Sequence, residues 1–276
     1  MRNTIFGWTF EIGTRGGLSL ALSVFILITA NTSAQTNSRA VSQIGFELGG
    51  NFGYLRDLNF STLNFRERGL LFSLDYVYKN KTQKLLFTAD VDYSSGRLKS
   101  EASDFFNTDY LLANLELSGL FKLRTHNPDK FVSYVGPQYN SFFQYAQWGD
   151  DRDNWTYLMA HGLNIKWLGT FQLTARKSLQ TSLSIPLLTN LVRPPYNGFD
   201  QYIVEHENEV AHLSFRGKTA TFNKYIAFDW KTRYQYNLSE RVGLVFNYLL
   251  RYQFVAGDNN VKHLQNQLTT GIAVKW

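Results

Sequence analysis

From Gln43 to the C-terminus, apolar and polar side chains alternate along the chain with a period of two. Within 111–123, for example, mainly leucines occupy one parity, whereas Asn114, Glu116 and Lys122 occupy the other. Successive side chains of a β-strand point to opposite faces of the sheet, so each such segment is predicted to be a strand with one apolar and one polar face. Ten segments show this pattern, at about 43–56, 69–80, 84–94, 109–123, 131–146, 155–173, 178–191, 223–238, 242–255 and 262–276.

The connections between these segments alternate in length. The short ones are 79–83, 124–130, 174–177 and 239–241, and the mostly longer ones are 58–68, 95–108, 147–154, 192–222 and 256–261. Tight turns at one end, long loops at the other and an even number of strands are typical of a barrel that crosses a membrane. A soluble β-sandwich would bury its apolar faces between two sheets and would not sort its loops in this way. We therefore predict an all-β fold, a transmembrane antiparallel up-and-down β-barrel of about ten strands, with eight or twelve as alternatives.

Two prolines fall inside predicted strands. Pro137 lies in 131–146 and Pro186 lies in 178–191. Proline has no backbone N–H to donate to a neighbouring strand, and a closed barrel has no free edge where the missing donor is harmless. We expect each proline at a β-bulge or outside the membrane-spanning part of its strand.

The alternation also explains an unusual composition. Hydrophobic residues make up 44% of the 276 residues and aromatic residues 16%, yet the mean hydropathy is −0.26. So many aromatic rings exclude a disordered chain. The absence of cysteine excludes disulfides, thiolate metal sites and a cysteine nucleophile. The net charge of +6 is dispersed rather than clustered, so no nucleic-acid partner is expected.

The N-terminus carries the features of an export signal. Basic residues precede an apolar stretch at 17–30, and small residues follow it at Thr32 and Ala34. That stretch is too short to span a bilayer as a helix but suits the core of a signal peptide. We predict a signal peptide at 1–34 and a barrel domain at 35–276, and an amphipathic or buried first helix is the alternative.

The chain ends in Thr-Thr-Gly-Ile-Ala-Val-Lys-Trp. Thr269, Gly271, Val274 and Trp276 resemble, position by position, the C-terminal signal of outer-membrane barrel proteins: a polar residue, a glycine, an apolar residue and a final aromatic residue. The resemblance implies that the barrel-assembly machinery of a Gram-negative cell reads this strand, and that outer-membrane lipid or lipopolysaccharide surrounds the barrel. With the short turns in the periplasm, as in such barrels, both termini are periplasmic and the long loops are extracellular.

Charged side chains with the polar parity are predicted to point into the barrel. They are Glu47, Asp75, Asp90, Asp92, Glu116, Asp229, Lys79, Lys122, Lys166, Lys231, Arg233, Arg251 and Lys275. A barrel of roughly eight strands already fills its interior with side chains, so ten strands predict a narrow lumen crossed by ion pairs. We expect an integral outer-membrane protein with a structural or surface-binding role, or a small-solute pore.

The alternative is a barrel hydrolase with its site at the extracellular mouth. Asp90 and Asp92 point inward toward the loop end of their strand, and the longest loop contains Glu205, His206 and Glu207. This combination is similar to that of omptins, ten-stranded outer-membrane proteases in which an Asp-x-Asp pair and an acid–His pair activate a water; the other strand sequences do not match. The resemblance implies peptide hydrolysis, whereas ion pairing across the lumen is the structural role for the same carboxylates.

A lipid-modifying enzyme is less well supported by the sequence. Outer-membrane phospholipases use a His-x-Ser pair that faces lipid; His161 has the outward parity, but Leu163 occupies the serine position. We therefore interpret His161 as an interfacial or packing residue. The acidic residues Asp150, Asp151 and Asp153 lack the glycine and glutamate that complete an EF-hand, so neither a metal site nor a cofactor is predicted.

Overall fold

The computed structural model describes residues 3–5, 8–10, 40–59, 61–100, 108–124, 130–148, 155–193, 217–257 and 259–276. The chain divides into two compact units, Met1–Arg39 and Ala40–Trp276. In the first unit, β1 (Asn3–Ile5) and β2 (Trp8–Phe10) pair as an antiparallel hairpin. The rest of the segment predicted to be a signal peptide lies outside the described residues, and the signal peptide stays a prediction.

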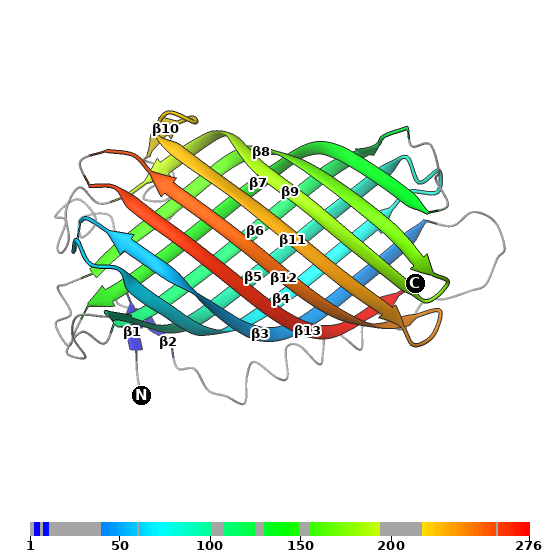
Figure 1. Cartoon of the computed structure of the whole chain (residues 1–276), viewed down its shortest axis with the longest axis horizontal. Helices are drawn as coiled ribbons and strands as arrows, with labels where there is room; N and C mark the ends of the chain where they lie inside the picture. Colours follow the sequence, from blue (N-terminus) through cyan, green and yellow to red (C-terminus); the bar gives the residue numbers. More distant parts are fainter. Residues whose placement is uncertain are drawn as a thin grey trace. The chain divides into compact units, whose positions relative to one another are not determined.

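The second unit is a closed barrel of ten long antiparallel strands, which Figure 1 shows from the side. The strands are β3 (Val41–Asp57), β4 (Phe65–Lys79), β5 (Leu85–Ser100), β6 (Thr108–Lys122), β7 (Phe131–Trp148), β8 (Trp155–Thr174), β9 (Lys177–Val192), β11 (Tyr225–Asn237), β12 (Val242–Val255) and β13 (Val261–Lys275). Each pairs with the next, and β13 pairs with β3 to close the barrel. All ten predicted strands are confirmed. Within the described residues there is no helix long and apolar enough to cross a membrane.

The two faces of the wall follow the alternation of the sequence. On β6, Asn114, Glu116 and Ser118 point into the barrel and are buried, whereas Leu117 and Phe121 point outward and are 44% and 59% exposed. Large apolar side chains are exposed in the same way on other strands, among them Leu70, Phe72, Trp230, Phe246, Leu268 and Ile272. The middle of the wall therefore has an apolar outer surface and charged groups inside, whereas outward positions near the loop end, such as Arg68 and Arg97, are also charged.

Two strands are longer at the loop end than the sequence pattern indicates. β4 begins at Phe65 rather than at 69, and β5 continues to Ser100 rather than ending at 94. Because Phe65 pairs with Ser100, the two extensions stabilise each other through the backbone ladder. A further short strand, β10 (Lys218–Ala220), pairs with the loop end of β9 and was not expected from the pattern.

Pro186 lies at a β-bulge, as predicted. On β8, Asn164 pairs with Pro186 but the next residue toward the loop end, Leu163, pairs with Leu188, so β9 contains one extra residue at this point. The bulge places the proline where the ladder is already irregular, which is where a residue without an N–H is tolerated.

The expectation for Pro137 is wrong. It points outward in the middle of β7 and pairs with Ile165 on β8 in an unshifted register. On the β6 side the ladder omits Pro137 and Gly136 and resumes in the same register. The missing N–H therefore removes only the pairing next to the proline. β7 continues through Pro137 and begins at Phe131, as predicted.

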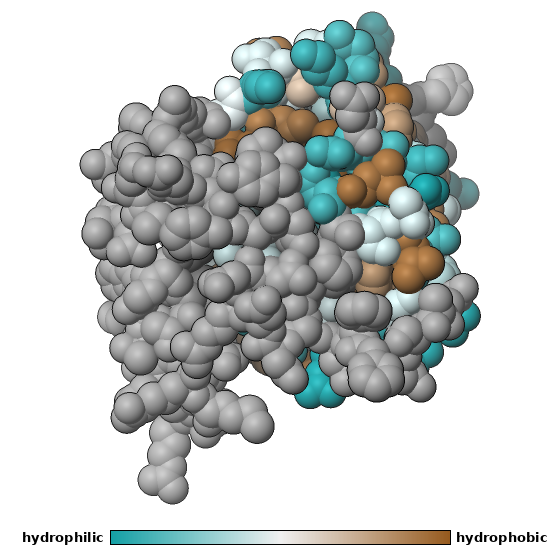
Figure 2. Space-filling model, turned by 90° about the vertical axis from the view of Figure 1, so that its left-hand side faces the viewer, coloured by the Kyte–Doolittle hydropathy of each residue, from teal (hydrophilic) through white to brown (hydrophobic). Residues whose placement is uncertain are grey.

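The interior of the barrel contains three layers. A layer at the loop end is apolar and consists mainly of Leu55, Phe65, Leu98, Tyr110, Leu112, Phe142, Ala146, Leu158, Ala160, Ala220, Tyr225, Val255 and Val261. A smaller apolar layer at the turn end consists of Leu86, Leu120, Tyr134 and Leu168, with Val77 and Val132 against them. The charged layer lies between the two. Figure 2, which looks at the loop end, shows both apolar (brown) and polar (teal) residues on its coloured part.

Candidate functional site

Arg251 connects opposite walls of the charged layer. It is only 1% exposed, and its Nε and Nη2 donate to the two carboxylate oxygens of Asp229 at 2.9 and 2.7 Å. Nη2 also donates to Glu116 Oε1 at 3.3 Å, and the guanidinium lies 5.3 Å from the ring centre of Phe142. In the ten-strand order, β12 and β6 lie opposite each other, so the Arg251–Glu116 ion pair crosses the lumen.

Two lysines extend this network. Lys231 on β11 donates to Asp90 Oδ1 at 2.8 Å, and β11 and β5 are again on opposite sides of the barrel. Lys166 Nζ lies 3.3 Å from Glu116 Oε2 and 4.0 Å from Asp90 Oδ2. Opposite charges thus alternate from Lys231 through Asp90, Lys166 and Glu116 to Arg251.

Arg233 forms a second ion-pair cluster next to the first. Its Nη1 donates to Asp75 Oδ1 at 2.7 Å and lies 3.3 Å from Glu47 Oε1. The other oxygen of Glu47 accepts hydrogen bonds from Thr269, at 2.5 Å, and from Asn247. The inward orientation that the alternation predicts is confirmed for the charged residues of both clusters, which are Glu47, Asp75, Asp90, Glu116, Lys166, Asp229, Lys231, Arg233 and Arg251.

The charged layer leaves little free space. One cavity, of about 30 Å³, lies among Asp75, Asp90, Lys166, Lys231 and Arg233. That volume holds on the order of one or two water molecules. At this level, therefore, side chains rather than solvent occupy most of the lumen.

Asp90 and Asp92 point into the lumen but do not lie near the mouth. Because β5 continues to Ser100, both carboxylates are in the middle of the strand, below Leu98 of the loop-end apolar layer. Asp90 is paired with Lys231 and Lys166, and Asp92 Oδ1 accepts a hydrogen bond from Ser73 Oγ at 2.6 Å. The prediction that the pair lies toward the loop end of its strand is wrong, and the contacts of Asp90 are those of a lumenal ion pair.

The omptin-like hypothesis also involves three residues of the longest loop. Glu205, His206 and Glu207 lie outside the described residues, as does the acidic cluster at 150–153. Within the described part of the chain, no group of three or more His, Asp or Glu side chains is arranged to hold a metal ion.

A buried acid–His pair at the loop end was not identified from the sequence. Glu67 on β4 and His263 on β13 have fully buried side chains, and His263 Nε2 lies 2.6 Å from Glu67 Oε2. Glu67 Oε1 also accepts hydrogen bonds from Gln265, at 2.7 Å, and from Asn51. Continuing the alternation of β4 upstream of 69 would have placed Glu67 on the inner face.

The beginning of the longest loop is attached to the far side of the mouth. Arg193, directly after β9, donates hydrogen bonds to Asp57 at the end of β3 and to the backbone carbonyl of Asn259. Thr156 Oγ1 donates to the second oxygen of Asp57 at 3.5 Å. The Arg193 and Asp57 side chains are 10% and 2% exposed. The Arg193 side chain therefore reaches across the mouth from the end of β9 and is held there by a buried ion pair.

A serine–histidine pair lies on the outer wall. Ser141 on β7 and His161 on β8 are register partners, both point outward, and Ser141 Oγ lies 2.8 Å from His161 Nδ1. On the other side of His161, the register partner on β9 is Asn190. The serine that the local sequence around His161 lacks is thus supplied by the neighbouring strand.

No protein-family model matches the chain, and no curated protein is detectably similar to it in sequence. Its structure is similar to that of the outer-membrane protease OmpT from Escherichia coli, with a TM-score of 0.53 and 7% identity over 89% of this chain and 99% of that one. It also matches the transport unit of the autotransporter AIDA-I from Escherichia coli, with a TM-score of 0.45 and 8% identity over 95% and 97% of the two chains. The similarity to OmpT shows that the chain has the fold of an outer-membrane β-barrel. At such low identity, the similarity establishes the fold of the chain and assigns no catalytic residue.

The C-terminal motif closes this outer-membrane-type barrel. Thr269 and Gly271 lie on the inner face of β13, where Thr269 contacts Glu47, whereas Val274 and Trp276 lie on the outer face. Trp276 exchanges two backbone hydrogen bonds of 3.0 Å with Ser42, and its ring centre lies 6.4 Å from that of Tyr76. The motif residues therefore all take part in, or extend, the pairing that joins the two ends of the barrel.

Proposed function

We propose that this protein is a non-conducting barrel of the outer membrane with a structural or surface-binding role. In this proposal the short turns and both termini face the periplasm, and the long loops face the cell exterior. Outer-membrane lipid, including lipopolysaccharide, surrounds the apolar outer wall, and the barrel-assembly machinery recognises the last strand. The fold, the apolar outer surface and the C-terminal motif support this placement.

The observation that carries the proposal is the filling of the lumen. Solutes crossing the barrel would have to pass two apolar layers and the ion-pair network between them. The network joins opposite walls, and its charges are already paired with one another. A buried ion pair that loses one partner is strongly destabilised, so these groups resist rearrangement to admit a solute. This interior favours the role of a rigid scaffold for surface loops and argues against that of a small-solute pore.

Reconstituted into planar lipid bilayers, the protein is expected to show no steady conductance above that of the bare bilayer. Replacing one buried aromatic residue of each apolar layer, in the double variant Tyr134→Ala and Phe142→Ala, is expected to produce measurable openings because it removes packing from both layers. The outward-facing variant Phe121→Ala is the matched control and should stay silent. A large and steady conductance of the unmodified protein would contradict the proposal.

A second candidate function is hydrolysis of lipid esters on the outer wall, and the Ser141–His161 pair is the observation that favours it. The 2.8 Å contact allows His161 to take the hydroxyl proton while Ser141 Oγ attacks an ester carbonyl. The lipid alcohol would leave with that proton, and water would then release the fatty acid from the serine. The pair faces outward, where the acyl chains of the bilayer would lie.

This second function predicts release of fatty acid from dioleoylphosphatidylcholine in mixed micelles. Ser141→Ala and His161→Ala should each reduce the rate by at least about 100-fold, since each removes one half of the nucleophile–base pair. Ser95, an outward-facing and exposed serine of β5, offers the control variant Ser95→Ala, which should keep the full rate. If the unmodified protein releases no more fatty acid than Ser141→Ala, the wall is not a hydrolase.

A further inference from the structure

Six basic side chains gather on the outer wall of the barrel, at the loop end of β13, β3, β4 and β5. These four strands are neighbours in the barrel, and each of the six residues has the outward parity of its strand. We call them the basic patch: Arg56, Arg66, Arg68, Arg97, Lys99 and Lys262. Elsewhere around the wall, outward positions at the same end include the neutral residues Tyr145 on β7, Tyr157 on β8 and Tyr252 on β12. The outward-facing cations therefore gather on one side of the barrel.

The strand register places these cations opposite one another. They form three pairs of register partners on adjacent strands, which are Arg68–Arg97, Arg66–Lys99 and Arg56–Lys262. Register partners on one face of an antiparallel sheet have their Cβ atoms about 4.5–5.5 Å apart, and like charges at that separation destabilise the sheet. The pairing of the strands therefore gains nothing from this arrangement, whereas a bound anion would remove the repulsion.

Neighbouring acidic residues do not neutralise the patch. Arg68, Arg97 and Lys99 form no ion pair with any residue that the structure describes. Asp109 on β6 is the register partner of Arg97, but the two side chains do not form a salt bridge. Glu67, between Arg66 and Arg68 in the sequence, points inward to His263. The patch thus carries positive charge that an external ligand can neutralise.

The apolar wall begins directly beside these cations. Phe52, the register partner of Arg68 on β3, is 44% exposed, and Leu70, two positions further along β4, is 68% exposed. Apolar outward residues of this kind occur around the whole barrel, so they do not mark a site by themselves. Their contact with the patch does, because it places positive charge at the edge of an apolar surface. The anionic headgroup and the acyl chains of a lipid meet in the same way.

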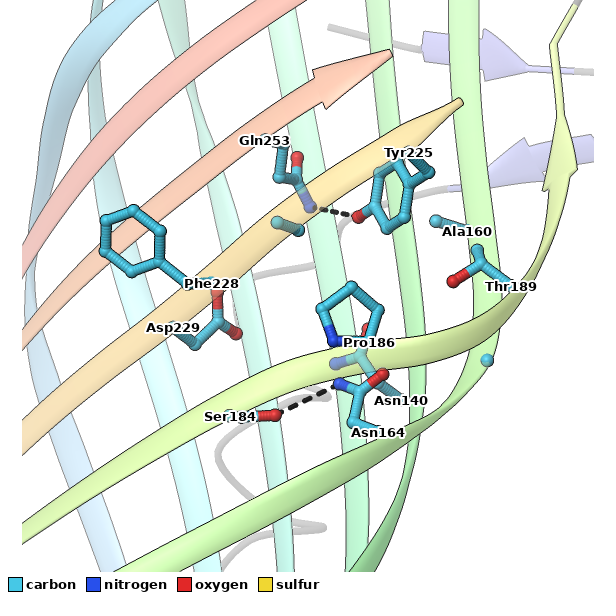
Figure 3. A pocket seen from close by; sticks show the side chains of 12 residues that line it. Asn140, Ala160, Asn164, Ser184, Pro186, Thr189, Tyr225, Phe228, Asp229 and Gln253 are labelled. Atoms are coloured by element: carbon cyan, nitrogen blue, oxygen red, sulfur yellow. Dashed lines mark hydrogen bonds between the residues drawn. The ribbon is translucent and has the colours of Figure 1, made fainter. Parts of the chain in front are cut away.

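The interior cavities are too small for a phosphorylated ligand. The cavity among the lumenal charges has a volume of about 30 Å³, and the recess beside Pro186 has about 10 Å³. Figure 3 shows this recess, in which Gln253 donates a hydrogen bond to Tyr225. Volumes of this order hold one or two water molecules. A ligand that carries phosphate groups would therefore have to bind outside the lumen.

We propose that the basic patch binds the phosphate groups of a lipid in the outer leaflet, and that this lipid is lipid A, the phosphorylated anchor of lipopolysaccharide. The guanidinium groups of Arg68 and Arg97 donate hydrogen bonds to one phosphate, and Lys99 adds a third positive charge. The acyl chains lie along the wall at Leu70. The inference rests on the placement proposed above, in which the loop end of the barrel lies in the outer leaflet.

The residue types and their position select this ligand. Arginine presents a planar fork of N–H donors that matches the oxygens of a phosphate, and clusters of basic residues beside a membrane bind phosphorylated headgroups. Arg68 and Arg97 lie on the strands themselves and not in the loops beyond them. A soluble polyanion would meet the loops first, whereas the headgroup of a lipid in the outer leaflet lies at the level where the apolar wall ends.

The test is microscale thermophoresis of the full barrel in neutral detergent micelles, titrated with diphosphoryl lipid A. The barrel is expected to bind this lipid at least about tenfold more tightly than lipid A from which both phosphates have been removed, the combined effect of two exposed ion pairs. The double variant Arg68→Gln and Arg97→Gln should lose most of this difference. Arg176→Gln with Lys177→Gln removes two exposed cations at the turn end and is the matched control, which should bind like the unmodified barrel.

A second measurement separates binding from folding. Removing two like charges from a register pair should leave the urea midpoint of unfolding unchanged or raise it, so weaker lipid binding by Arg68→Gln and Arg97→Gln would not result from a damaged barrel. A lower midpoint would show that the pair stabilises the wall and would overturn the proposal.

Three binding results would also overturn it. They are equal affinity of the unmodified barrel for the two lipids, equal loss of affinity in the two double variants, and binding of heparin that depends on Arg68 and Arg97 while binding of lipid A does not. The last result would assign the patch to a soluble polyanion. None of these measurements involves conductance, so a conducting barrel would contradict the scaffold role and leave the lipid site to be judged by its own test.

Discussion

Replacing Arg251 by methionine is expected to lower the free energy of unfolding of the barrel by about 3–5 kcal/mol, the cost of removing one partner from a buried ion pair. The substitution keeps much of the side-chain volume but leaves Asp229 without its bidentate partner and leaves Glu116 with Lys166 as its remaining ion-pair partner among the described residues. Urea unfolding of the barrel in vesicles, followed by tryptophan fluorescence, measures the change. Arg97→Met, at an exposed outward position of β5, should change the stability by less than about 0.5 kcal/mol.

A double variant separates the charge from the packing of Arg251. Adding Asp229→Asn to Arg251→Met removes the carboxylate that the first substitution leaves uncompensated, so part of the lost stability should return. A single variant Arg251→Met that unfolds at the same urea concentration as Arg97→Met would show that the cross-lumen network does not stabilise the barrel.

Replacing Gly271 by alanine is expected to destabilise the closed barrel by about 3 kcal/mol or more, as overpacking against rigid backbone does. A Cβ atom at this position would lie 2.0 Å from the carbonyl oxygen of Phe46 on β3 and 2.7 Å from Glu47 Cα. Both are backbone atoms of the strand that β13 pairs with to close the barrel, so neither can move without disturbing the closure. The fraction of folded barrel after refolding into micelles, read from electrophoresis with and without heating, measures the effect.

Gly119 provides the matched control for this substitution. A Cβ atom there would meet a ring carbon of Phe87 at 3.6 Å, an ordinary contact, so Gly119→Ala should refold like the unmodified protein. Refolding in micelles contains no assembly machinery, so a defect of Gly271→Ala in this assay reports packing rather than recognition of the C-terminal signal. If Gly271→Ala refolds as well as Gly119→Ala, the close approach of β3 is not the reason for this glycine.

The sequence predicted the strands well because a barrel wall has only two environments. Each residue faces either outward or the interior, so a period of two is sufficient to mark a strand and to assign the face of Glu116, Lys231 or Arg251. The prediction failed where the alternation continued into a segment with the composition of a loop. This is why Glu67 was missed and why Asp90 and Asp92 were placed too close to the mouth.

What the sequence by itself determined is therefore the fold class and the face on which most strand side chains lie, since these depend on neighbours two positions apart; it left eight, ten or twelve strands open. Only the tertiary structure decided which residues meet across strands. The contacts between Ser141 and His161, between Glu67 and His263, and between Arg251 and Glu116 join residues 20, 196 and 135 positions apart. The like-charge pairs of the basic patch likewise result from the pairing of β13 with β3 and of β4 with β5. Such contacts depend on strand register and on barrel closure, which periodicity alone does not specify.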